Sequence, residues 1–174
     1  MKKLNTLYLL SLLFLITACD KEETNLEVTN DNLAGEWELT AFTYGGRSTN
    51  EVGGETYRSN FAGNGRDLAY SVRFNTDGTY TSSGSYTIDA MYAFGGQEFS
   101  QVLIIDDALG TGTYTLNGDE LSVTRDEDGE TSVATILQLT NDVLIFELQQ
   151  TKTNTSQSAT STAIIDGDFQ MRRK

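Results

Sequence analysis

Apolar and polar residues alternate along most of the chain after Leu33, in short runs separated by Gly, Asn and Asp. The first run places Trp37, Leu39 and Ala41 at every second position. A period of two is typical of strands that bury one face, and no stretch has convincing helical periodicity. The pattern therefore predicts an all-β domain.

Turn sequences between these runs predict antiparallel strands joined mainly between sequence neighbours. Residues 75–78, 117–119, 126–130 and 140–142 are rich in Asn, Asp and Gly, which suit tight hairpin corners. Proline is absent, so these residue types must form the turns. We count eight or nine strands, which include a nearly continuous apolar run from Phe99 to Ile105.

Three connections are expected to be longer than the others: Gly45 to Asp67, Asp89 to Glu98 and Thr151 to Thr162. The first is rich in glycine and is interpreted as a flexible flap, and the last is a polar tract interpreted as a mobile loop. Strands that follow one another as a meander protect their edges by closing into an antiparallel up-and-down β-barrel. An open sandwich with Greek-key crossings is the alternative.

The first 18 residues have the features of a signal peptide. Lys2 and Lys3 precede an almost unbroken apolar stretch from Leu4 to Thr17, which is shorter than the roughly 20 residues that span a bilayer. Residues 16–19, Ile-Thr-Ala-Cys, resemble the bacterial lipobox, and Cys19 is the single cysteine of the chain. The resemblance implies cleavage before Cys19 and lipid attachment to its thiol. An ordinary signal peptide that ends near a cysteine is the alternative.

Residues 19–32 are expected to form a lipidated cysteine and a polar tether, and residues 33–174 the barrel domain. Two acyl chains on one residue hold a protein stably at a membrane without spanning it. Lys21, Glu22 and Glu23 resemble the export tag of Bacteroidetes-type surface lipoproteins. We therefore expect a lipid anchor in the outer membrane with the domain at the cell surface. An anchor that faces the periplasm, followed by a plain solvated linker, is the alternative.

Charge and composition exclude several classes of function. The chain has 12 Lys and Arg against 25 Asp and Glu, and loss of Lys2 and Lys3 with the signal peptide takes the net charge from −13 to −15. A polyanion of this kind repels phosphate backbones, so no nucleic-acid partner is expected. Histidine is absent and Cys19 is the only thiol, which removes the commonest general base and the commonest metal ligands. We expect no catalytic residues, no metal site, no cofactor and no enzymatic activity.

Several segments resemble one family of barrel domains. Residues 33–40, Leu-Ala-Gly-Glu-Trp-Glu-Leu-Thr, are similar to the opening strand of lipocalin-like domains, whose mark is Gly-x-Trp. Segments 72–80, 112–116 and 137–144 are similar to the lipocalin-like domains of Bacteroidetes lipoproteins. The resemblance implies a lipocalin-like barrel over nearly the whole domain. The helix that precedes the final strand in classical lipocalins is missing, because 151–162 is a polar tract with low helix propensity.

In this family the Trp of the opening strand closes one end of the barrel, and an Arg of the last strand packs across it. The resemblance assigns these roles to Trp37 and to Arg172 or Arg173. A planar guanidinium stacks on an indole face while its donors reach backbone carbonyls. Ligand chemistry is not carried over, because the residues that line the pocket vary most within the family.

Two functions remain open at this stage. The strand phase points a set of aromatic residues inward, and these either line a pocket for a small apolar or amphipathic ligand or fill the core of a solid barrel. In the second case, the protein is a non-enzymatic interaction or structural component that pairs with another cell-envelope protein through exposed edges or loops. The candidate ligand-binding residues are Tyr70, Tyr80, Tyr86, Tyr114 and Phe146.

Overall fold

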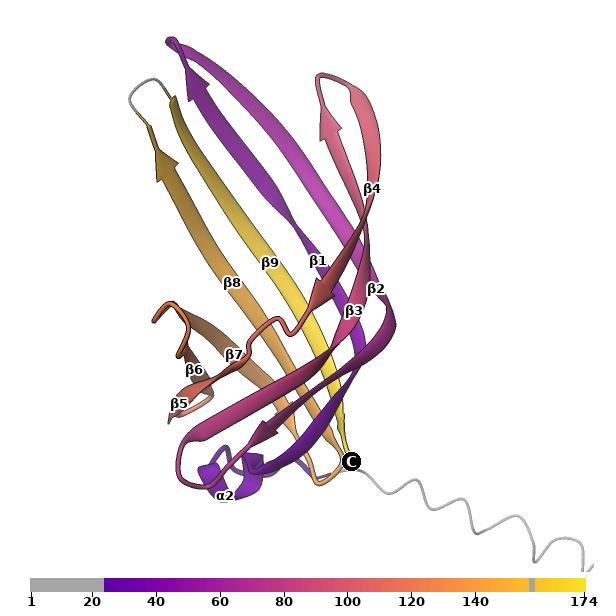
Figure 1. The fold of residues 1–174 in the computed structure, drawn as a ribbon, viewed down its shortest axis with the longest axis vertical. Coiled ribbons are helices and arrows are strands. Elements are labelled where there is room, and N and C mark those ends of the chain that lie inside the picture. Colours follow the sequence, from indigo (N-terminus) through magenta and orange to yellow (C-terminus); the bar gives the residue numbers. More distant parts are fainter. Residues whose placement is uncertain (1–23, 157–158) are drawn as a thin grey trace, which may run out of the picture.

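The computed structural model describes residues 24–156 and 159–174, so the predicted signal peptide and Cys19 lie outside the described residues. The fold is all-β and antiparallel, as the alternation predicts, with a single helical turn in the described part (Figure 1). The elements are α2 (Asn30–Leu33), β1 (Gly35–Val52), β2 (Glu55–Phe74), β3 (Thr79–Phe94), β4 (Gln97–Asp106), β5 (Thr111–Asn117), β6 (Glu120–Arg125), β7 (Thr131–Leu139), β8 (Val143–Thr155) and β9 (Ala159–Arg173).

Eight strands close into a ring, which confirms the up-and-down barrel and removes the sandwich alternative. Each strand from β5 to β9 pairs with its sequence neighbour, β9 pairs with β1, and β1, β2 and β3 follow in order. A short pairing of 79–81 in β3 with 111–113 in β5 completes the ring. Strand β4 lies outside it and pairs with β3 alone.

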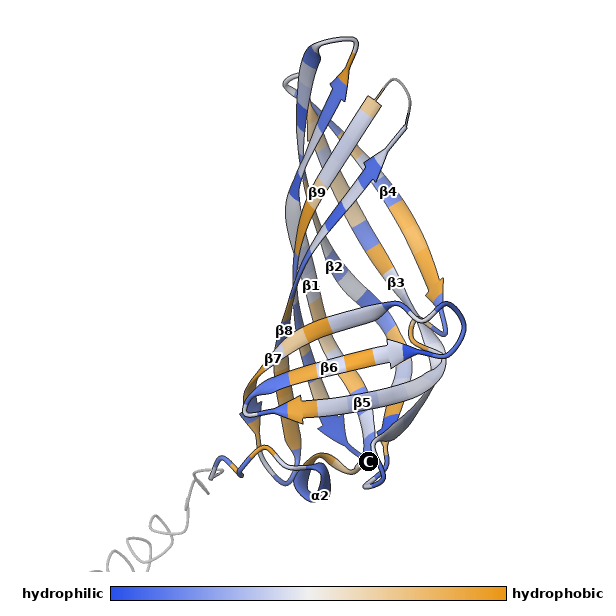
Figure 2. Ribbon diagram, turned by 90° about the vertical axis from the view of Figure 1, so that its left-hand side faces the viewer, coloured by the Kyte–Doolittle hydropathy of each residue, from blue (hydrophilic) through white to orange (hydrophobic). Residues whose placement is uncertain are grey.

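The strands differ greatly in length, and this difference shapes the open end. β5, β6 and β7 have 7, 6 and 9 residues, whereas β1 and β2 have 18 and 20. The long strands therefore rise beyond the ring as a curved open sheet (Figure 1). The short strands cross only the lower part (Figure 2). Beyond Leu148, β8 pairs with β9 but no longer with β7, so the projecting sheet has free edges at β8 and β4.

The prediction of a flexible flap from Gly45 to Asp67 is wrong, because this segment is the paired upper half of β1 and β2. Two of its glycines lie opposite aromatic residues of the neighbouring strand, Gly63 opposite Tyr44 and Gly46 opposite Phe61. A Cβ on Gly63 would come within 2.1 Å of the Tyr44 ring, and a Cβ on Gly46 within 2.6 Å of the Phe61 ring. The glycines make room for rings that lie across the sheet. In the sequence alone, a run with this many glycines is typical of a loop.

Two other predicted connections also form strands. The segment 151–162 contains the end of β8 and the start of β9, which pair with each other as far as Thr155 and Thr160. The segment 89–98 is the hairpin of β3 and β4, which turns at Gly95 and Gly96. Residues 151–156 are polar because this part of β8 is exposed to solvent, so the usual apolar signal of a strand is absent there.

The apolar run 99–105 forms strand β4 but is largely exposed. Val102 and Ile104 are 57% and 70% exposed, because β4 is an edge strand outside the ring. Figure 2 shows the resulting hydrophobic stretch along β4.

The closed end is built around Trp37, which is fully buried. Its indole Nε1 donates to the Leu33 carbonyl at 2.8 Å, and the Arg173 guanidinium lies 4.1 Å above the ring centroid. Gly35 has a φ of +141°, and a Cβ there would come within 2.3 Å of Arg173 Nη1. The glycine of Gly-x-Trp is therefore required by the arginine that covers the tryptophan.

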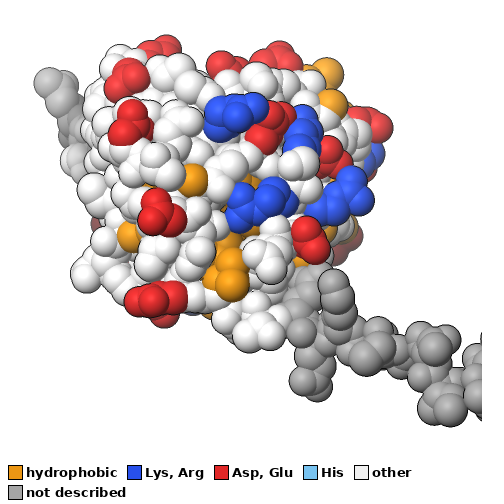
Figure 3. Space-filling view, turned by 90° about the horizontal axis from the view of Figure 1, so that it is seen from below, with side chains coloured by type: hydrophobic (Ala, Val, Ile, Leu, Met, Phe, Trp, Pro, Cys, Tyr) orange, Lys and Arg blue, Asp and Glu red, His pale blue; other side chains and the backbone are white. Residues whose placement is uncertain are grey.

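Of the two arginines considered for this role, Arg173 occupies it and Arg172 does not. Arg172 points outward and pairs with Glu38 at 3.0 Å. Glu36 lies nearby and pairs with Lys174 at 2.9 Å and with Arg73 at 2.5 Å. Seen from this end, the Lys and Arg side chains gather toward one side among acidic ones (Figure 3).

Part of the predicted tether packs on the barrel rather than extending from it. Leu26 and Val28 contact the core, and the backbone N–H of Leu26 donates to the Leu139 carbonyl at 2.7 Å. Thr29 caps α2 by accepting from the N–H of Asn32 at 3.2 Å. The chain therefore enters the barrel at its closed end, opposite the projecting sheet (Figure 2).

Candidate ligand-binding cavity

The barrel interior contains a cavity of about 200 Å³. Its wall comes from β1, β2, β3, β6, β7, β8 and β9 and from the connection between β4 and β5. The described residues that line it include no charged side chain. Their side-chain polar groups are the hydroxyls of Tyr70, Tyr86 and Ser132. The cavity is therefore a largely apolar space, and the Tyr70 oxygen is shielded from it although the Tyr70 side chain lines it.

Three of the five aromatic residues predicted to bind ligand line this cavity, namely Tyr70, Tyr86 and Phe146. Tyr80 and Tyr114 are buried inside the barrel but lie outside its lining. The Tyr80 hydroxyl donates to the Leu109 carbonyl at 3.3 Å, and that of Tyr114 to the Asn75 carbonyl at 2.6 Å. Their phenol groups therefore fix the connections that contain Leu109 and Asn75. The strand phase located the interior face correctly but could not locate the cavity within it.

Tyr70 differs from these two residues because its hydroxyl oxygen has no partner. The oxygen is buried and makes no hydrogen bond of ordinary geometry in the described part of the chain, although Ser82 and the Leu109 backbone lie close enough to lower its pKa in part. Its ring meets that of Tyr86 edge-on at 5.6 Å. Burial raises the pKa of Tyr70 well above the ordinary value of a tyrosine. The phenol therefore keeps its proton at neutral pH and remains a hydrogen-bond donor.

The connection of residues 107–110 forms one wall of the cavity through Ala108 and Leu109. Ser82 holds this connection in two ways: its Oγ donates to Asp107 Oδ1 at 2.8 Å, and its N–H donates to the Gly110 carbonyl at 2.7 Å. Asp107 has a φ of +42° and donates its own N–H to the Gly84 carbonyl at 2.9 Å. The chain crosses from β4 to β5 here without pairing the two strands, and in doing so it covers the cavity.

A series of aromatic rings leads from the cavity wall onto the concave face of the projecting sheet. Phe146 and Phe169 stack at 4.8 Å, and Phe169 lies 4.6 Å from Phe42. Phe42 stacks with Tyr44 at 5.9 Å, and Tyr44 lies 5.8 Å from Phe61. Burial raises the pKa of Tyr44 to about 12. Phe42, Tyr44 and Phe61 were not among the residues predicted from the sequence. The glycines that pair with such rings on neighbouring strands are a signal that could have indicated them.

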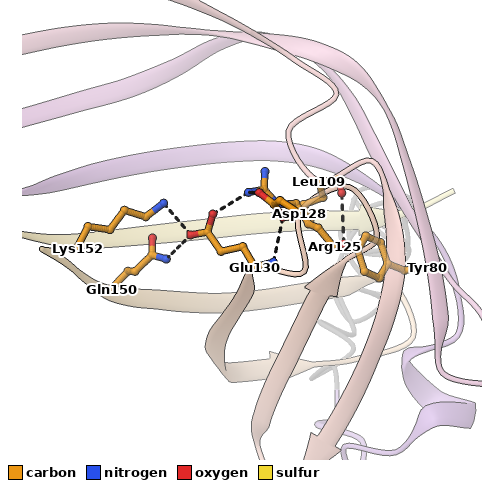
Figure 4. Close-up of polar contacts among 7 residues, drawn as sticks. All are labelled: Tyr80, Leu109, Arg125, Asp128, Glu130, Gln150 and Lys152. Atoms are coloured by element: carbon orange, nitrogen blue, oxygen red, sulfur yellow. Dashed lines mark hydrogen bonds and ion pairs between the residues drawn. The ribbon is translucent and has the colours of Figure 1, made fainter. Parts of the chain in front are cut away.

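A network of charged and polar side chains joins the turn between β6 and β7 to strand β8 (Figure 4). Glu130 accepts from Lys152 at 2.8 Å, from Gln150 at 3.2 Å and from Arg125 at 2.7 Å. Asp128 also pairs with Arg125, at 2.5 Å. The hydrogen bond from Lys152 holds the pKa of Glu130 below its usual value. The cations at the rim of the short strands are thus already engaged by the protein's own acids.

Two further features bear on the kind of site. Within residues 24–156 and 159–174, no group of three or more His, Cys, Asp or Glu side chains lies close enough together to hold a metal ion. In the same residues, no helix combines the length and the hydropathy needed to cross a membrane.

An antiparallel barrel with one end sealed by a tryptophan and an apolar cavity inside has the architecture of barrels that can hold a ligand in their interior. The chain matches the lipocalin-like domain family over residues 33–146 and belongs to that family. No curated protein and no solved structure matches the chain.

Proposed function

We propose that this barrel binds a small apolar or amphipathic molecule in its interior cavity. The observation that carries the proposal is the apolar cavity of about 200 Å³ with no charged group in its described lining. An apolar cavity of roughly 150 Å³ in another protein stays dry and takes up benzene. A cavity of this size therefore suits a compact molecule somewhat larger than benzene. The function involves no catalytic step, in keeping with a family whose fold generally serves binding.

Binding of indane, a neutral bicyclic hydrocarbon, tests the proposal. The full chain in detergent solution is expected to gain about 3–6 °C in Tm at a free indane concentration ten times the Kd, because a ligand that binds only the folded state stabilises it. The variant Ala108→Phe places a ring in the cavity wall and is expected to abolish this gain.

Ala62→Phe is the matched control, because Ala62 is exposed on strand β2 and does not line the cavity. It is expected to keep the full gain in Tm. An equal gain for Ala108→Phe would locate the binding outside the cavity and contradict the proposal.

We further propose that the protein is a lipoprotein of the Bacteroidetes type, anchored in the outer membrane through lipid on Cys19 and displayed at the cell surface. The apolar stretch of residues 4–17, the Ile-Thr-Ala-Cys sequence and the Lys-Glu-Glu tag support this. The described chain begins at the closed end of the barrel, where Leu26 bonds to Leu139. An anchor on this side leaves the projecting sheet directed away from the bilayer. An anchor that faces the periplasm is the alternative.

Labelling of growing cells with radioactive palmitate tests the anchor. The native chain is expected to incorporate label and to sediment with membranes, whereas Cys19→Ala is expected to lose both properties. Digestion of intact cells with protease then separates the two orientations, since only a surface domain is degraded. Palmitate incorporation by Cys19→Ala would contradict lipidation at this residue.

The second candidate function, an interaction or structural role in the cell envelope, is favoured by one observation. Strand β4 has a free edge and carries Val102 and Ile104 largely exposed. Such an edge accepts an additional strand from a partner protein. This function needs no cavity, so it becomes the stronger candidate if indane leaves the Tm of the native chain unchanged.

A further inference from the structure

The free edge of strand β4 is uncharged and largely apolar over most of its length. Residues 99–105, Phe-Ser-Gln-Val-Leu-Ile-Ile, contain no charged side chain, and Val102 and Ile104 are 57% and 70% exposed (Figure 2). β4 pairs with β3 on one side and has no strand on the other side among the described residues. Edges of this kind pair readily with another strand, so native proteins protect them with charges, prolines or bulges.

The other free edge of the projecting sheet has such protection, whereas β4 does not. Residues 149–155 of β8, Gln-Gln-Thr-Lys-Thr-Asn-Thr, are polar, and Lys152 places a cation in the middle of the run. β4 has charges only near its ends, at Glu98 and Asp106, and its pairing with β3 continues without a bulge. The β4 edge is therefore available to a partner strand, and that strand need not carry a compensating charge along residues 99–105.

The backbone groups that face this edge follow from the ladder between β3 and β4. The N–H of Asp107 donates to the Gly84 carbonyl, and the register of the ladder is unbroken along β4. Because backbone groups alternate in direction along a strand, the odd-numbered residues of β4 bond to β3. The N–H and carbonyl groups of residues 98, 100, 102, 104 and 106 therefore point to the free edge.

These groups allow β4 to pair with a second copy of itself in an antiparallel register centred on Leu103. In this register, Val102 of each copy lies opposite Ile104 of the other, so the two most exposed side chains of the strand meet twice. They form hydrogen-bonded pairs, because the backbone groups of both residues face the edge.

The acidic residues at the two ends of β4 favour the same register. With Leu103 at the centre, Asp106 lies opposite Ser100 of the second copy, and Glu98 lies beyond the end of the opposite strand. A shift of two residues in one direction places Glu98 opposite Asp106, where like charges repel. The same shift in the other direction places Asp106 opposite Val102. The register centred on Leu103 avoids both arrangements.

We propose that this chain forms a dimer in which β4 pairs antiparallel with β4 of a second copy, with the two Leu103 residues opposite each other. The inference rests on the second candidate function, for which it names the partner, and it is independent of the cavity. β4 runs from the tip of the projecting sheet toward the ring, so the closed ends of the two copies lie at opposite ends of the dimer (Figure 1). Detergent solution leaves both copies free to take this orientation.

Sedimentation equilibrium of the full chain in a density-matched detergent solution measures the association. The native chain is expected to pass from monomer to dimer as its concentration rises, and to go no further, because the dimer uses both β4 edges. Val102→Lys is expected to weaken the dimer at least about tenfold, because each dimer then holds two ammonium groups opposite apolar side chains.

Met91→Lys is the matched control. Met91 is 50% exposed and lies opposite Ser100, on the same face of the sheet as Val102, but it belongs to β3, one strand inside the edge. This variant is expected to dimerise as the native chain does. Val102→Pro is a second test that spares the fold, because the N–H of Val102 points away from β3. It is expected to remain a monomer, since each copy loses an edge donor.

Leu103→Cys tests the register. Opposed residues of a pair without hydrogen bonds have Cα atoms about 4.5 Å apart, which a disulfide can span. Under mild oxidation, Leu103→Cys is expected to form a covalent dimer that the native chain does not form. Gln101→Cys is expected to form little, because its two copies lie about 14 Å apart in this register.

Three results would overturn the inference. A monomer at every concentration, or a dimer that Val102→Lys and Met91→Lys weaken equally, would exclude pairing through β4. Growth beyond a dimer would indicate head-to-tail pairing of β4 with another edge. More disulfide with Gln101→Cys than with Leu103→Cys would exclude the register. Since none of these results affects binding of indane, failure of the dimer is distinct from failure of the ligand-binding function. A purely monomeric chain also leaves the β4 edge open to a strand from a different protein.

Discussion

Replacement of Trp37 by alanine is expected to lower the free energy of unfolding by about 3–5 kcal/mol. Trp37 is completely buried at the closed end, where its ring fills the space beneath Arg173 and its Nε1 holds the Leu33 carbonyl. Alanine at this position leaves a cavity. The Leu33 carbonyl then lacks its hydrogen-bond donor, and the Arg173 guanidinium lacks the indole ring on which it stacks. Since small domains have only about 5–15 kcal/mol of stability, this is a large share of the total.

Urea denaturation followed by circular dichroism measures this loss. Trp37→Phe is the informative companion, because it retains an aromatic ring but not the Nε1 donor, and it is expected to cost about half as much. A loss of less than about 1 kcal/mol for Trp37→Ala would show that the closed end contributes little to stability.

Arg173→Ala is expected to cost about 2–4 kcal/mol, because this side chain makes three hydrogen bonds to two segments far from it in sequence and stacks on Trp37. Its Nε donates to the Asn141 carbonyl at 2.7 Å, its Nη1 to that of Ala34 at 2.5 Å and its Nη2 to that of Asn32 at 2.7 Å. Arg173→Lys is expected to recover only a small part, because a single ammonium cannot reach three carbonyls and stack on Trp37.

Arg172 provides the matched control one residue away. Its side chain is 64% exposed and makes an ion pair with Glu38. Exposed pairs contribute about 0–1 kcal/mol, so Arg172→Ala is expected to be nearly neutral in the same urea titration. Equal losses for the two alanine variants would mean that the stacked position of Arg173 has no particular importance.

The barrel can be predicted from the sequence because its short hairpins carry local signals. Asp77 and Gly78 mark the turn between β2 and β3, and Asn117 and Gly118 mark the turn between β5 and β6. Each corner depends on residues that tolerate positive φ, and the alternation beside it depends on one buried face. Both signals can be read without knowledge of distant contacts.

The projecting sheet was wrongly predicted as loops, because its strands have no buried face of the usual kind. Polar residues on both surfaces and glycines beneath aromatic rings look like loops when each strand is considered alone. Gly63 becomes intelligible only when Tyr44 of the neighbouring strand lies across it. The pairing that stabilises this region is therefore invisible to a local pattern.

For the candidate site too, some features follow from the sequence alone and others only from the tertiary structure. The order of residues along the chain is enough to identify the all-β class, the meander of strands and the Gly-x-Trp opening. It also predicts that Tyr70, Tyr86 and Phe146 point inward. These features depend only on neighbours within a few positions. Only the packed fold selects Arg173 over Arg172, leaves Tyr80 and Tyr114 out of the cavity wall and isolates the hydroxyl of Tyr70. Those outcomes depend on distances between strands far apart in sequence, where a change of a few ångströms decides whether a polar atom finds a partner.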